Sequence, residues 1–509
     1  MDYSADTVMD LLARGAADAP AIGAPGRAPL TYAALRSLAA RTAAALAGLG
    51  IGRGDRVAIV LPNGPEMAAS FVAIACAATT APLNPAYRRD EFDFYLSDLN
   101  ARALVIAEGM ESPTREVAHA RGIPIVELVP DAEAAGAFTL RALGASAAAP
   151  VHSAAPAADD VALVLHTSGT TSRPKIVPLR QVNVTASAYH IGRTLRLTPD
   201  DVCLNIMPLF HIHGLMAATL ASLAAGASVV CTTGFNAFRF FSWFAEVRPT
   251  WYTAVPTMHQ TLLALADRHK ATIADGRLRF LRSSSASLPP QVMTGLEETF
   301  GVPVIESYGM TEASHQMASN PLPPAPRFAG SVGVASGPEI AIMDDDGALL
   351  PAGGLGEVVI RGRNVTAGYE NNPDANARAF TNGWFRTGDQ GTLDGQGYLR
   401  LTGRLKEIIN RGGEKVSPLE VDTVLMDHPA VAQVVTFAMP HTSLGEDVAA
   451  AVVLREGETL GEHALRDFCA QRLAQFKVPR KIVFVPEIPK GATGKLQRIG
   501  LAEKLGLSA

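Results

Sequence analysis

The chain has 509 residues, of which 48% are hydrophobic and 18% charged, and its formal net charge is −5. This length predicts two or more domains, or one large domain with subdomains, and the apolar fraction allows a substantial core. The slightly acidic balance gives no indication of nucleic-acid binding.

Three sequence features indicate where in the cell the protein is expected. They are the first residues, one apolar stretch and the cysteines. Residues 1–6 are acidic and lack the basic start of a signal peptide, and the apolar stretch 67–82 is too short to span a bilayer. We therefore expect a cytoplasmic protein without a membrane partner, and a buried helix over 67–82. The cysteines, which match no metal-binding spacing and are expected to be buried in a reducing compartment, are Cys76, Cys203, Cys231 and Cys469.

Short apolar runs alternate with helical patterns over most of the length. Such alternation predicts an α/β architecture with largely parallel sheets. Buried strands are predicted at residues 56–61, 104–106, 124–128, 227–231 and 302–306.

The pattern changes after about residue 333. Glycine-rich turns separate short strands up to residue 401, and Asp344–Gly347 is a hairpin-turn signal, which predicts a small antiparallel or barrel-like subdomain. Beyond residue 403 the pattern predicts a compact α+β unit. We therefore predict a large N-terminal domain over 1–404 and a small C-terminal domain over 405–509. The elements expected in the latter are helices at 419–427 and 464–475 and strands at 430–437 and 447–454.

The most informative stretch is the loop Thr167–Lys175, which follows the apolar run 161–165. Its hydroxyl side chains, glycine and two cations offer many hydrogen-bond donors to a polyphosphate. The loop is not a Walker A motif, so the mechanism of a P-loop ATPase does not follow. Taken alone, the loop fits a solvated turn equally well.

Four further motifs follow in order, and each has a plain alternative as a turn or an exposed loop. In Tyr308–Glu312 the tyrosine can stack on a base, and the threonine and glutamate can meet phosphate and Mg²⁺. In Trp384–Asp389 the carboxylate can bind ribose hydroxyls. Gly403–Pro418 contains a glycine pair that a ligand can approach closely, and Pro489–Arg498 presents Lys495 on a glycine-flanked loop.

The ordered set of five motifs resembles the adenylate-forming superfamily, which comprises acyl-CoA synthetases, firefly-luciferase-like enzymes and adenylation domains of peptide synthetases. The resemblance covers the chain from Leu30–Tyr32 to Lys495. It implies a large N-terminal domain, a small mobile C-terminal domain and an active site between them, with ATP, Mg²⁺ and CoA as cofactors or co-substrates. Ser172 and Ile176 stand where glycine is usual, but the small side chain of Ser172 should leave phosphate binding intact.

The resemblance assigns roles to individual residues. The nucleotide contacts it implies are Thr167, Ser168, Gly169, Thr170, Thr171 and Lys175 on the β- and γ-phosphates, Ser285, Ala286 and Tyr308 on adenine, and Asp389 and Arg404 on ribose. The other roles it implies are Thr311 on phosphate, Glu312 on Mg²⁺, Lys406 at the hinge, Gly412 and Gly413 in the thioester-forming loop, and Lys495 at the α-phosphate.

The mechanism implied has two halves. A substrate carboxylate first attacks the α-phosphate while Lys495 neutralises the meeting anions, and pyrophosphate leaves. The C-terminal domain then rotates about Lys406 and brings Gly412–Gly413 to the site for attack by a thiol on the acyl-adenylate.

The acid is approached through two histidines. His211 would gate the channel for the acyl and pantetheine groups, and His213 would point to the acyl group, although a pair of packed histidines is the alternative. The segments 306–315 and 319–323 look like the oxalate–CoA ligase branch of plants and fungi. Oxalate is a dianion, so its pocket needs polar or cationic groups, for which the candidates are His213, Ser287 and His315.

We therefore predict an AMP-forming acyl-CoA synthetase for oxalate, with a coumarate-like aromatic or another small or medium-chain acid as the alternative. A carrier-protein module is not indicated, because no carrier domain follows Lys495. A non-catalytic homologue is not indicated, because Lys495 and Glu312 are both present. The shared motifs leave a luciferase-like oxidase open.

Overall fold

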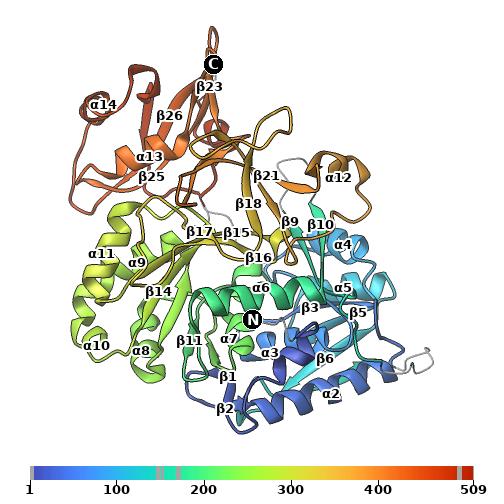
Figure 1. The fold of residues 1–509 in the computed structure, drawn as a ribbon. Coiled ribbons are helices and arrows are strands. Elements are labelled where there is room, and N and C mark those ends of the chain that lie inside the picture. Colours follow the sequence, from blue (N-terminus) through green and yellow to red (C-terminus); the bar gives the residue numbers. More distant parts are fainter. Residues whose placement is uncertain (1–4, 145–150, 152–153, 168–173, 490–495, 508–509) are drawn as a thin grey trace.

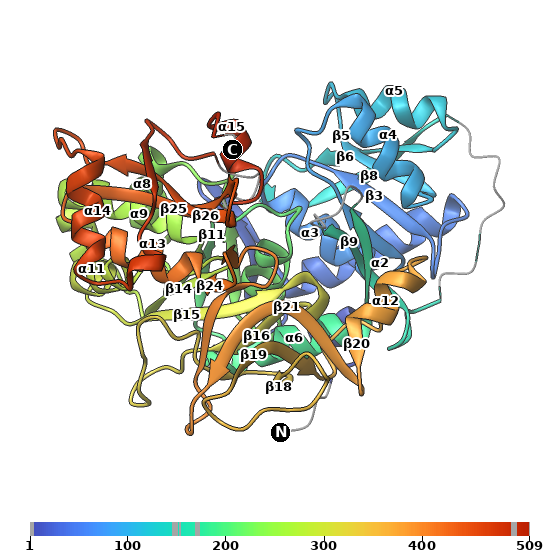
Figure 2. The same cartoon turned by 90° about the horizontal axis from the view of Figure 1, so that it is seen from above.

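The computed structural model describes residues 5–144, 151, 154–167, 174–489 and 496–507. Within these ranges the chain forms four β-sheets. Two large sheets with their helices make up the lower part of the molecule in Figure 1, and the last sheet lies above them. Seen from above, this last part lies over the side that carries α8, α9 and α11 (Figure 2).

The largest sheet has ten strands and a parallel centre that runs from β1 to β15. Helices cover both faces of this centre, which explains why its strands are apolar runs without alternation. In spatial order the strands are β17 (Val334–Ala335), β16 (His315–Ser319), β15 (Val304–Met310), β14 (Phe280–Ser284), β13 (Trp251–Ala254), β11 (Val202–Asn205), β12 (Ser228–Cys231), β1 (Pro20–Ala24), β2 (Arg27–Thr31) and β7 (Ala134–Ala135).

The second sheet has seven strands and ends in the antiparallel hairpin of β9 and β10. Its inner strands are parallel. In spatial order they are β10 (Lys175–Arg180), β9 (Val161–Thr167), β4 (Thr79–Pro82), β3 (Arg56–Val60), β5 (Ala103–Ala107), β6 (Ile125–Pro130) and β8 (Phe138–Leu143).

One helical layer lies between the two large sheets, because α3 and α6 each contact strands of both. The main apolar core fills this layer, and two further cores lie under the outer helices. The inner helices are α1 (Val8–Leu12), α2 (Tyr32–Gly48), α3 (Pro65–Ala75), α6 (Gln181–Thr194), the π-helix η1 (His213–Leu220) and α7 (Ala221–Ala224). The outer helices are α4 (Arg89–Asp98), α5 (Pro113–Ala120), α8 (Ala237–Val247), α9 (Pro256–Ala266), η2 (Asp267–His269), α10 (Lys270–Ala274) and α11 (Pro290–Phe300).

The third sheet is antiparallel, as the glycine-rich turns predict, and Gly347 adopts a φ of 87° in the expected turn. It comprises β18 (Glu339–Met343), β19 (Leu355–Arg361), β21 (Trp384–Leu393), β20 (Phe380–Thr381) and β22 (Leu399–Arg404), with α12 (Pro373–Ala379) beside it.

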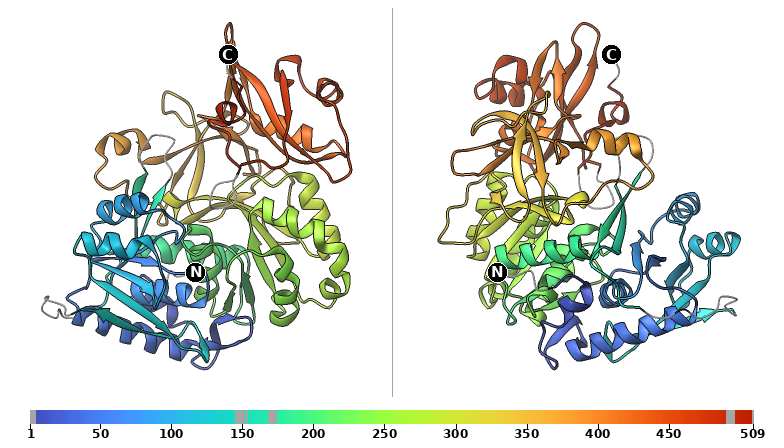
Figure 3. Two further views of the ribbon diagram at one scale, coloured as in Figure 1. Left: turned by 180° about the vertical axis from the view of Figure 1, so that it is seen from behind. Right: turned by 45° about the vertical axis from the view of Figure 1, so that its right-hand side comes forward.

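The fourth sheet belongs to the C-terminal part of the chain and packs against its own helices around a separate apolar core. Its elements are β23 (Ile409–Arg411), β24 (Glu414–Val416), α13 (Pro418–Met426), β25 (Val431–His441), β26 (Gly445–Leu454), α14 (Glu462–Ala470), η4 (Gln475–Lys477), β27 (Lys481–Phe484) and α15 (Leu501–Lys504). Figure 3 shows this part from behind and in a view in which the right-hand side of Figure 1 is turned forward.

Most sequence expectations about the fold are confirmed. The chain is α/β with a large N-terminal part and a smaller α+β C-terminal part, and all four cysteines are buried. The exact boundary after residue 404 stays a prediction; it falls where β22 ends. Among the described residues, no helix has the length and apolar character that crossing a membrane requires.

One expectation about the elements is wrong. The stretch 67–82 is not one helix, because α3 ends at Ala75 and Thr79–Pro82 form the buried strand β4. The β-branched pair Thr79 and Thr80 favours an extended strand, and both hydroxyls donate to carbonyl groups of β9.

Candidate active site

The loop that the sequence singles out is the connection of a β-hairpin. Thr167 at the end of β9 lies opposite Lys175 at the start of β10. The predicted phosphate contacts Ser168, Gly169, Thr170 and Thr171 lie outside the described residues. The described ends of the loop are therefore one residue from each strand.

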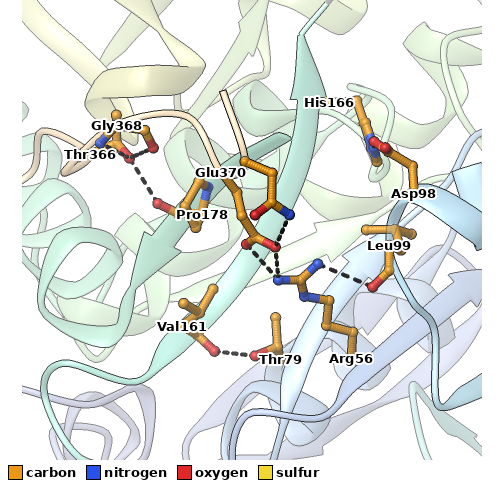
Figure 4. A network of polar contacts seen from close by, with 11 residues as sticks. Arg56, Thr79, Asp98, Leu99, Val161, His166, Pro178, Thr366, Gly368 and Glu370 are labelled. Atoms are coloured by element: carbon orange, nitrogen blue, oxygen red, sulfur yellow. Dashed lines mark hydrogen bonds and ion pairs between the residues drawn. The ribbon is translucent and has the colours of Figure 1, made fainter. Parts of the chain in front are cut away.

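A polar network fastens the base of this hairpin (Figure 4). His166 Nε2 lies 3.0 Å from Asp98 Oδ2, and Arg56 donates to both carboxylate oxygens of Glu370 at 2.5 and 2.6 Å. The Thr366 hydroxyl donates to the carbonyl of Pro178 at 2.9 Å. The contacts of His166 with Asp98 and of Pro178 with Thr366 thus join β9 and β10 to segments far away in sequence.

Lys175 and Glu312 both contact Tyr369. The Tyr369 hydroxyl donates to Glu312 Oε1 at 2.9 Å, and Lys175 Nζ lies 4.3 Å from the centre of the Tyr369 ring. Burial raises the pKa of Glu312, and the hydrogen bond from Tyr369, then Arg404 and Lys175, act against that rise. Burial lowers the pKa of Lys175, which the charge of Glu312 partly offsets.

Tyr308, Asp389 and Arg404 form a second chain of contacts. The Tyr308 hydroxyl donates to Asp389 Oδ2 at 2.5 Å, and Arg404 Nε lies 3.2 Å from Asp389 Oδ1. Asp389 and Arg404 are opposite each other on β21 and β22. Gly388 adopts a φ of 75° just before Asp389, which glycine permits without strain.

We call these six residues the carboxylate cluster: Lys175, Tyr308, Glu312, Tyr369, Asp389 and Arg404. They come from strands β10, β15, β21 and β22, the short helix η3 (Thr311–Ala313) and the loop that contains Tyr369. Thr311 is half-buried beside Glu312 in η3. The cluster combines two carboxylates with two cations; Tyr369 contacts both Glu312 and Lys175, and Tyr308 donates to Asp389.

A second group of polar side chains lies at the end of β14. His213 Nδ1 is 3.1 Å from Ser285 Oγ, His213 Nε2 is 2.6 Å from Thr253 Oγ1, and the rings of His213 and His315 meet edge to face at 4.9 Å. Arg282 Nη1 lies 3.4 Å from His213 Nε2. We call these five residues the histidine cluster: His213, Thr253, Arg282, Ser285 and His315.

The histidine cluster differs from the sequence expectation in one respect. Glu312 and His315 are not one helical turn apart, because η3 ends at Ala313 and His315 begins strand β16. Ser314 and His315 adopt positive φ values of 50° and 96°, so the chain reverses there and β16 runs back along β15. The reversal brings His315 to His213 instead of onto a face shared with Glu312.

Gly309 lies where the two clusters adjoin. It follows Tyr308 in β15 and lies opposite Gln316 of β16. A Cβ atom at this position would be 1.7 Å from the carbonyl oxygen of His315, so the two backbones approach as closely as only glycine allows.

The remaining predicted residues have varied surroundings. Ala286 and Ser287 are exposed just beyond β14, and the His213 N–H donates to His211 Nδ1 at 3.5 Å. Gly412 and Gly413, with φ values of 60° and 99°, form the turn between β23 and β24, as the glycine pair predicts.

The predicted hinge lies beside the last segment of the chain. Lys406 is exposed between β22 and β23. Lys495 lies outside the described residues, but Arg498, three positions later, is 3.4 Å from Glu407 and 2.6 Å from Asp422. The segment that follows Lys495 is therefore attached next to the hinge position.

Sequence reasoning missed three residues of these clusters, which are Tyr369, Thr253 and Arg282. Thr253 lies in β13, and nothing in its local pattern indicated a contact with His213. Tyr369 follows Gly368 within a loop, and nothing in its local pattern indicated a contact with Glu312. Arg282 gave a detectable signal, because it is a charged residue directly after the apolar pair Phe280–Leu281 in the fully buried strand β14, where unpaired charge is costly.

Comparison with known protein families identifies the family of this chain. A model described as "AMP-binding enzyme" matches residues 11–370, and one described as "AMP-binding enzyme C-terminal domain" matches residues 420–495. The chain belongs to the AMP-binding enzyme family. This membership confirms the resemblance to the adenylate-forming superfamily.

Relatives in this family cover nearly the whole chain. An oxalate–CoA ligase of Arabidopsis thaliana is 45% identical over 504 residues, 97% of each chain. An oxalate–CoA ligase of Saccharomyces cerevisiae is 42% identical over 481 residues, 90% of this chain and 88% of the relative. The crystal structure of ATP-bound MatB from Rhodopseudomonas palustris matches with a TM-score of 0.88 and 30% identity, covering 98% of this chain and 99% of that one.

Proposed function

We propose that this enzyme is an AMP-forming acid–CoA ligase that activates oxalate with ATP and transfers the oxalyl group to CoA. One observation carries the proposal: the carboxylate cluster lies next to a buried histidine cluster. The chain that holds both resembles oxalate–CoA ligases over nearly its whole length. The alternative of a coumarate-like acid is not favoured by these relatives.

The carboxylate cluster suits the nucleotide. Tyr308 offers a ring beside which adenine can stack, while Asp389 can accept hydrogen bonds from ribose hydroxyls. The hydroxyl of Tyr308 and the guanidinium of Arg404 hold the Asp389 carboxylate from two sides, which fixes its direction. Lys175 at the mouth of the hairpin would neutralise phosphate charge.

A magnesium ion fits this cluster through Glu312. Mg²⁺ is commonly held by one or two carboxylates together with substrate phosphates. Glu312 is a buried hard-oxygen donor whose Oε1 is oriented by Tyr369, with Lys175 nearby. When bound, the ion supplies charge neutralisation for the triphosphate.

The first half of the reaction joins two anions. A carboxylate oxygen of the acid attacks the α-phosphorus and pyrophosphate leaves, so the enzyme must neutralise charge and orient both reactants. We assign to Lys495 the contact with the carboxylate and the α-phosphate. The second half begins when Lys406 allows the C-terminal domain to turn, and the CoA thiol then attacks the oxalyl carbon and displaces AMP.

The histidine cluster suits a small polar acid. It is buried and rich in hydrogen-bonding groups, whereas a long apolar chain would leave these groups unpaired. His213, His315 and Ser287 would contact the acid, and Ser285 lies 3.1 Å from His213 Nδ1. His211 would gate the channel.

The test is ATP-dependent release of pyrophosphate with a panel of acids, with and without CoA. Oxalate, malonate, acetate, coumarate and a long fatty acid make up the panel. We expect oxalate to give the highest kcat/KM and a CoA thioester to form only when CoA is present. A higher kcat/KM for coumarate or the fatty acid contradicts the proposed substrate.

A further inference from the structure

Arg282 is a buried cation whose described partners are all neutral. Its side chain is 0% exposed on β14. It donates to Thr253 Oγ1 from Nη1 and to Gln316 Oε1 from Nη2, both at 3.3 Å, and its Nε has no hydrogen-bond partner among the described residues. Burial lowers its pKa to about 9, so the guanidinium still carries its charge at neutral pH.

Such a charge is unfavourable for the fold itself. An ion moved from water into the protein interior loses its hydration, and it is normally compensated by a paired opposite charge. The described residues provide hydrogen bonds to Arg282 but no carboxylate ion pair. The guanidinium is thus uncompensated until an anion arrives nearby.

The contacts of His213 connect the charge of Arg282 to the end of β14. Thr253 Oγ1 accepts from Arg282 Nη1 and lies 2.6 Å from His213 Nε2. Arg282 Nη1 also faces Nε2, at 3.4 Å. A guanidinium can only donate hydrogen bonds, so Nε2 is the acceptor in this contact. The ring proton is therefore assigned to Nδ1, which faces Ser285 Oγ at 3.1 Å.

We propose that Arg282 is a positioning and specificity-determining residue for a dianionic acid. It holds His213 as the Nδ1–H donor towards the end of β14, and it supplies the positive charge that stabilises a second carboxylate there. This inference rests on the proposed oxalate–CoA ligase function and deepens it. A monoanion of the same shape gains the hydrogen bond of His213 but much less from the charge.

Oxalate and oxamate provide a matched pair of substrates. Oxamate replaces one carboxylate with an amide of almost the same size, so it differs mainly by one charge. The experiment measures kcat and KM for pyrophosphate release with both acids, in the wild type and in Arg282→Gln. We expect Arg282→Gln to lower kcat/KM for oxalate about 100-fold, mainly through KM, and kcat/KM for oxamate less than about 5-fold. The reason is that the attraction of the buried charge for a second carboxylate exists only with the dianion.

Two further variants separate charge from structure. Arg282→Lys keeps the charge and should retain at least about a tenth of the wild-type preference for oxalate over oxamate. Thr253→Val removes one hydrogen-bond partner of His213 Nε2. This variant should lower kcat/KM for oxalate and for oxamate by the same few-fold factor. If Arg282→Gln lowers kcat/KM equally for oxalate and oxamate and leaves the KM for ATP unchanged, the inference is overturned.

If Arg282→Gln does not fold, Arg282→Lys decides. A preference for oxalate that collapses in this charge-conserving variant contradicts a role for the charge, and one that persists supports it. A wild-type enzyme that is inactive on oxalate overturns the proposed substrate instead. A wild type that prefers oxalate, with a preference that Arg282→Gln keeps, overturns only the inference about Arg282.

Discussion

The carboxylate cluster and the histidine cluster treat charge in opposite ways. In the carboxylate cluster, Asp389 is paired with Arg404 and Glu312 lies near Lys175, so its charges are largely balanced before a ligand binds. In the histidine cluster, Arg282 is buried among neutral partners. The comparison suggests that the first cluster serves the nucleotide common to all substrates, while the second selects the acid through a charge that the substrate must balance.

The largest expected effect tests the chemistry that both clusters serve. Lys495→Ala should lower the rate of pyrophosphate release by about a thousandfold, because the charge that neutralises the meeting anions is lost. Thioester formation from supplied oxalyl-adenylate and CoA should remain within about threefold of the wild type, since that step follows displacement of Lys495. Lys490→Ala is the matched control, and equal loss of both half-reactions contradicts the assignment.

A change in the histidine cluster should affect acids unequally. His213→Ala removes the ring that connects Arg282 and Thr253 to Ser285, and we expect kcat/KM to fall about a hundredfold for oxalate and less than about tenfold for acetate. The measurement is pyrophosphate release with each acid at fixed ATP. A loss of the same size for both acids would show that His213 supports the fold and not the choice of acid.

A change in the carboxylate cluster should affect all acids alike. Asp389→Asn keeps the size of the side chain but weakens the acceptor for ribose, so KM for ATP should rise about tenfold with every acid. The ratio of kcat/KM between oxalate and acetate should stay at its wild-type value. A changed ratio would mean that the carboxylate cluster also affects the choice of acid, contrary to the proposal.

The smallest effect concerns pH. Burial raises the pKa of Glu312, and the Tyr369 hydroxyl acts against this rise. Glu312 must be ionised to hold Mg²⁺, so activity should fall as the pH is lowered through its pKa. Tyr369→Phe should move this acidic limb to higher pH by about half a unit. The check is a pH profile of kcat/KM for ATP, and an unchanged or lower-lying limb speaks against the role of Tyr369.

The sequence predicted those parts of the molecule that local pattern determines. Apolar runs such as 104–106 and the turn at Gly412–Gly413 became strands and a hairpin, because period, burial and glycine conformation act over a few residues. The pairing of Asp389 with Arg404 also agrees with the grouping of these residues by resemblance.

The sequence could not predict contacts made by chain reversal or between distant loops. The positive φ values of Ser314 and His315 turn an expected helix into the start of a strand, although neither residue type favours that conformation strongly. Tyr369 reaches Glu312 across 57 positions of sequence. Such contacts depend on the packing of whole sheets, which local patterns do not encode.

Gly309 has a consequence for attempts to change the acid that this enzyme accepts. The backbones of β15 and β16 touch there without room for a side chain, so the spacing between Tyr308 and His315 cannot be adjusted in small steps. Redesign of the acid site can exchange the side chains of His213 or His315. Widening the site by moving β16 would displace Tyr308 as well, and would therefore disturb the adenine contact that we propose for Tyr308.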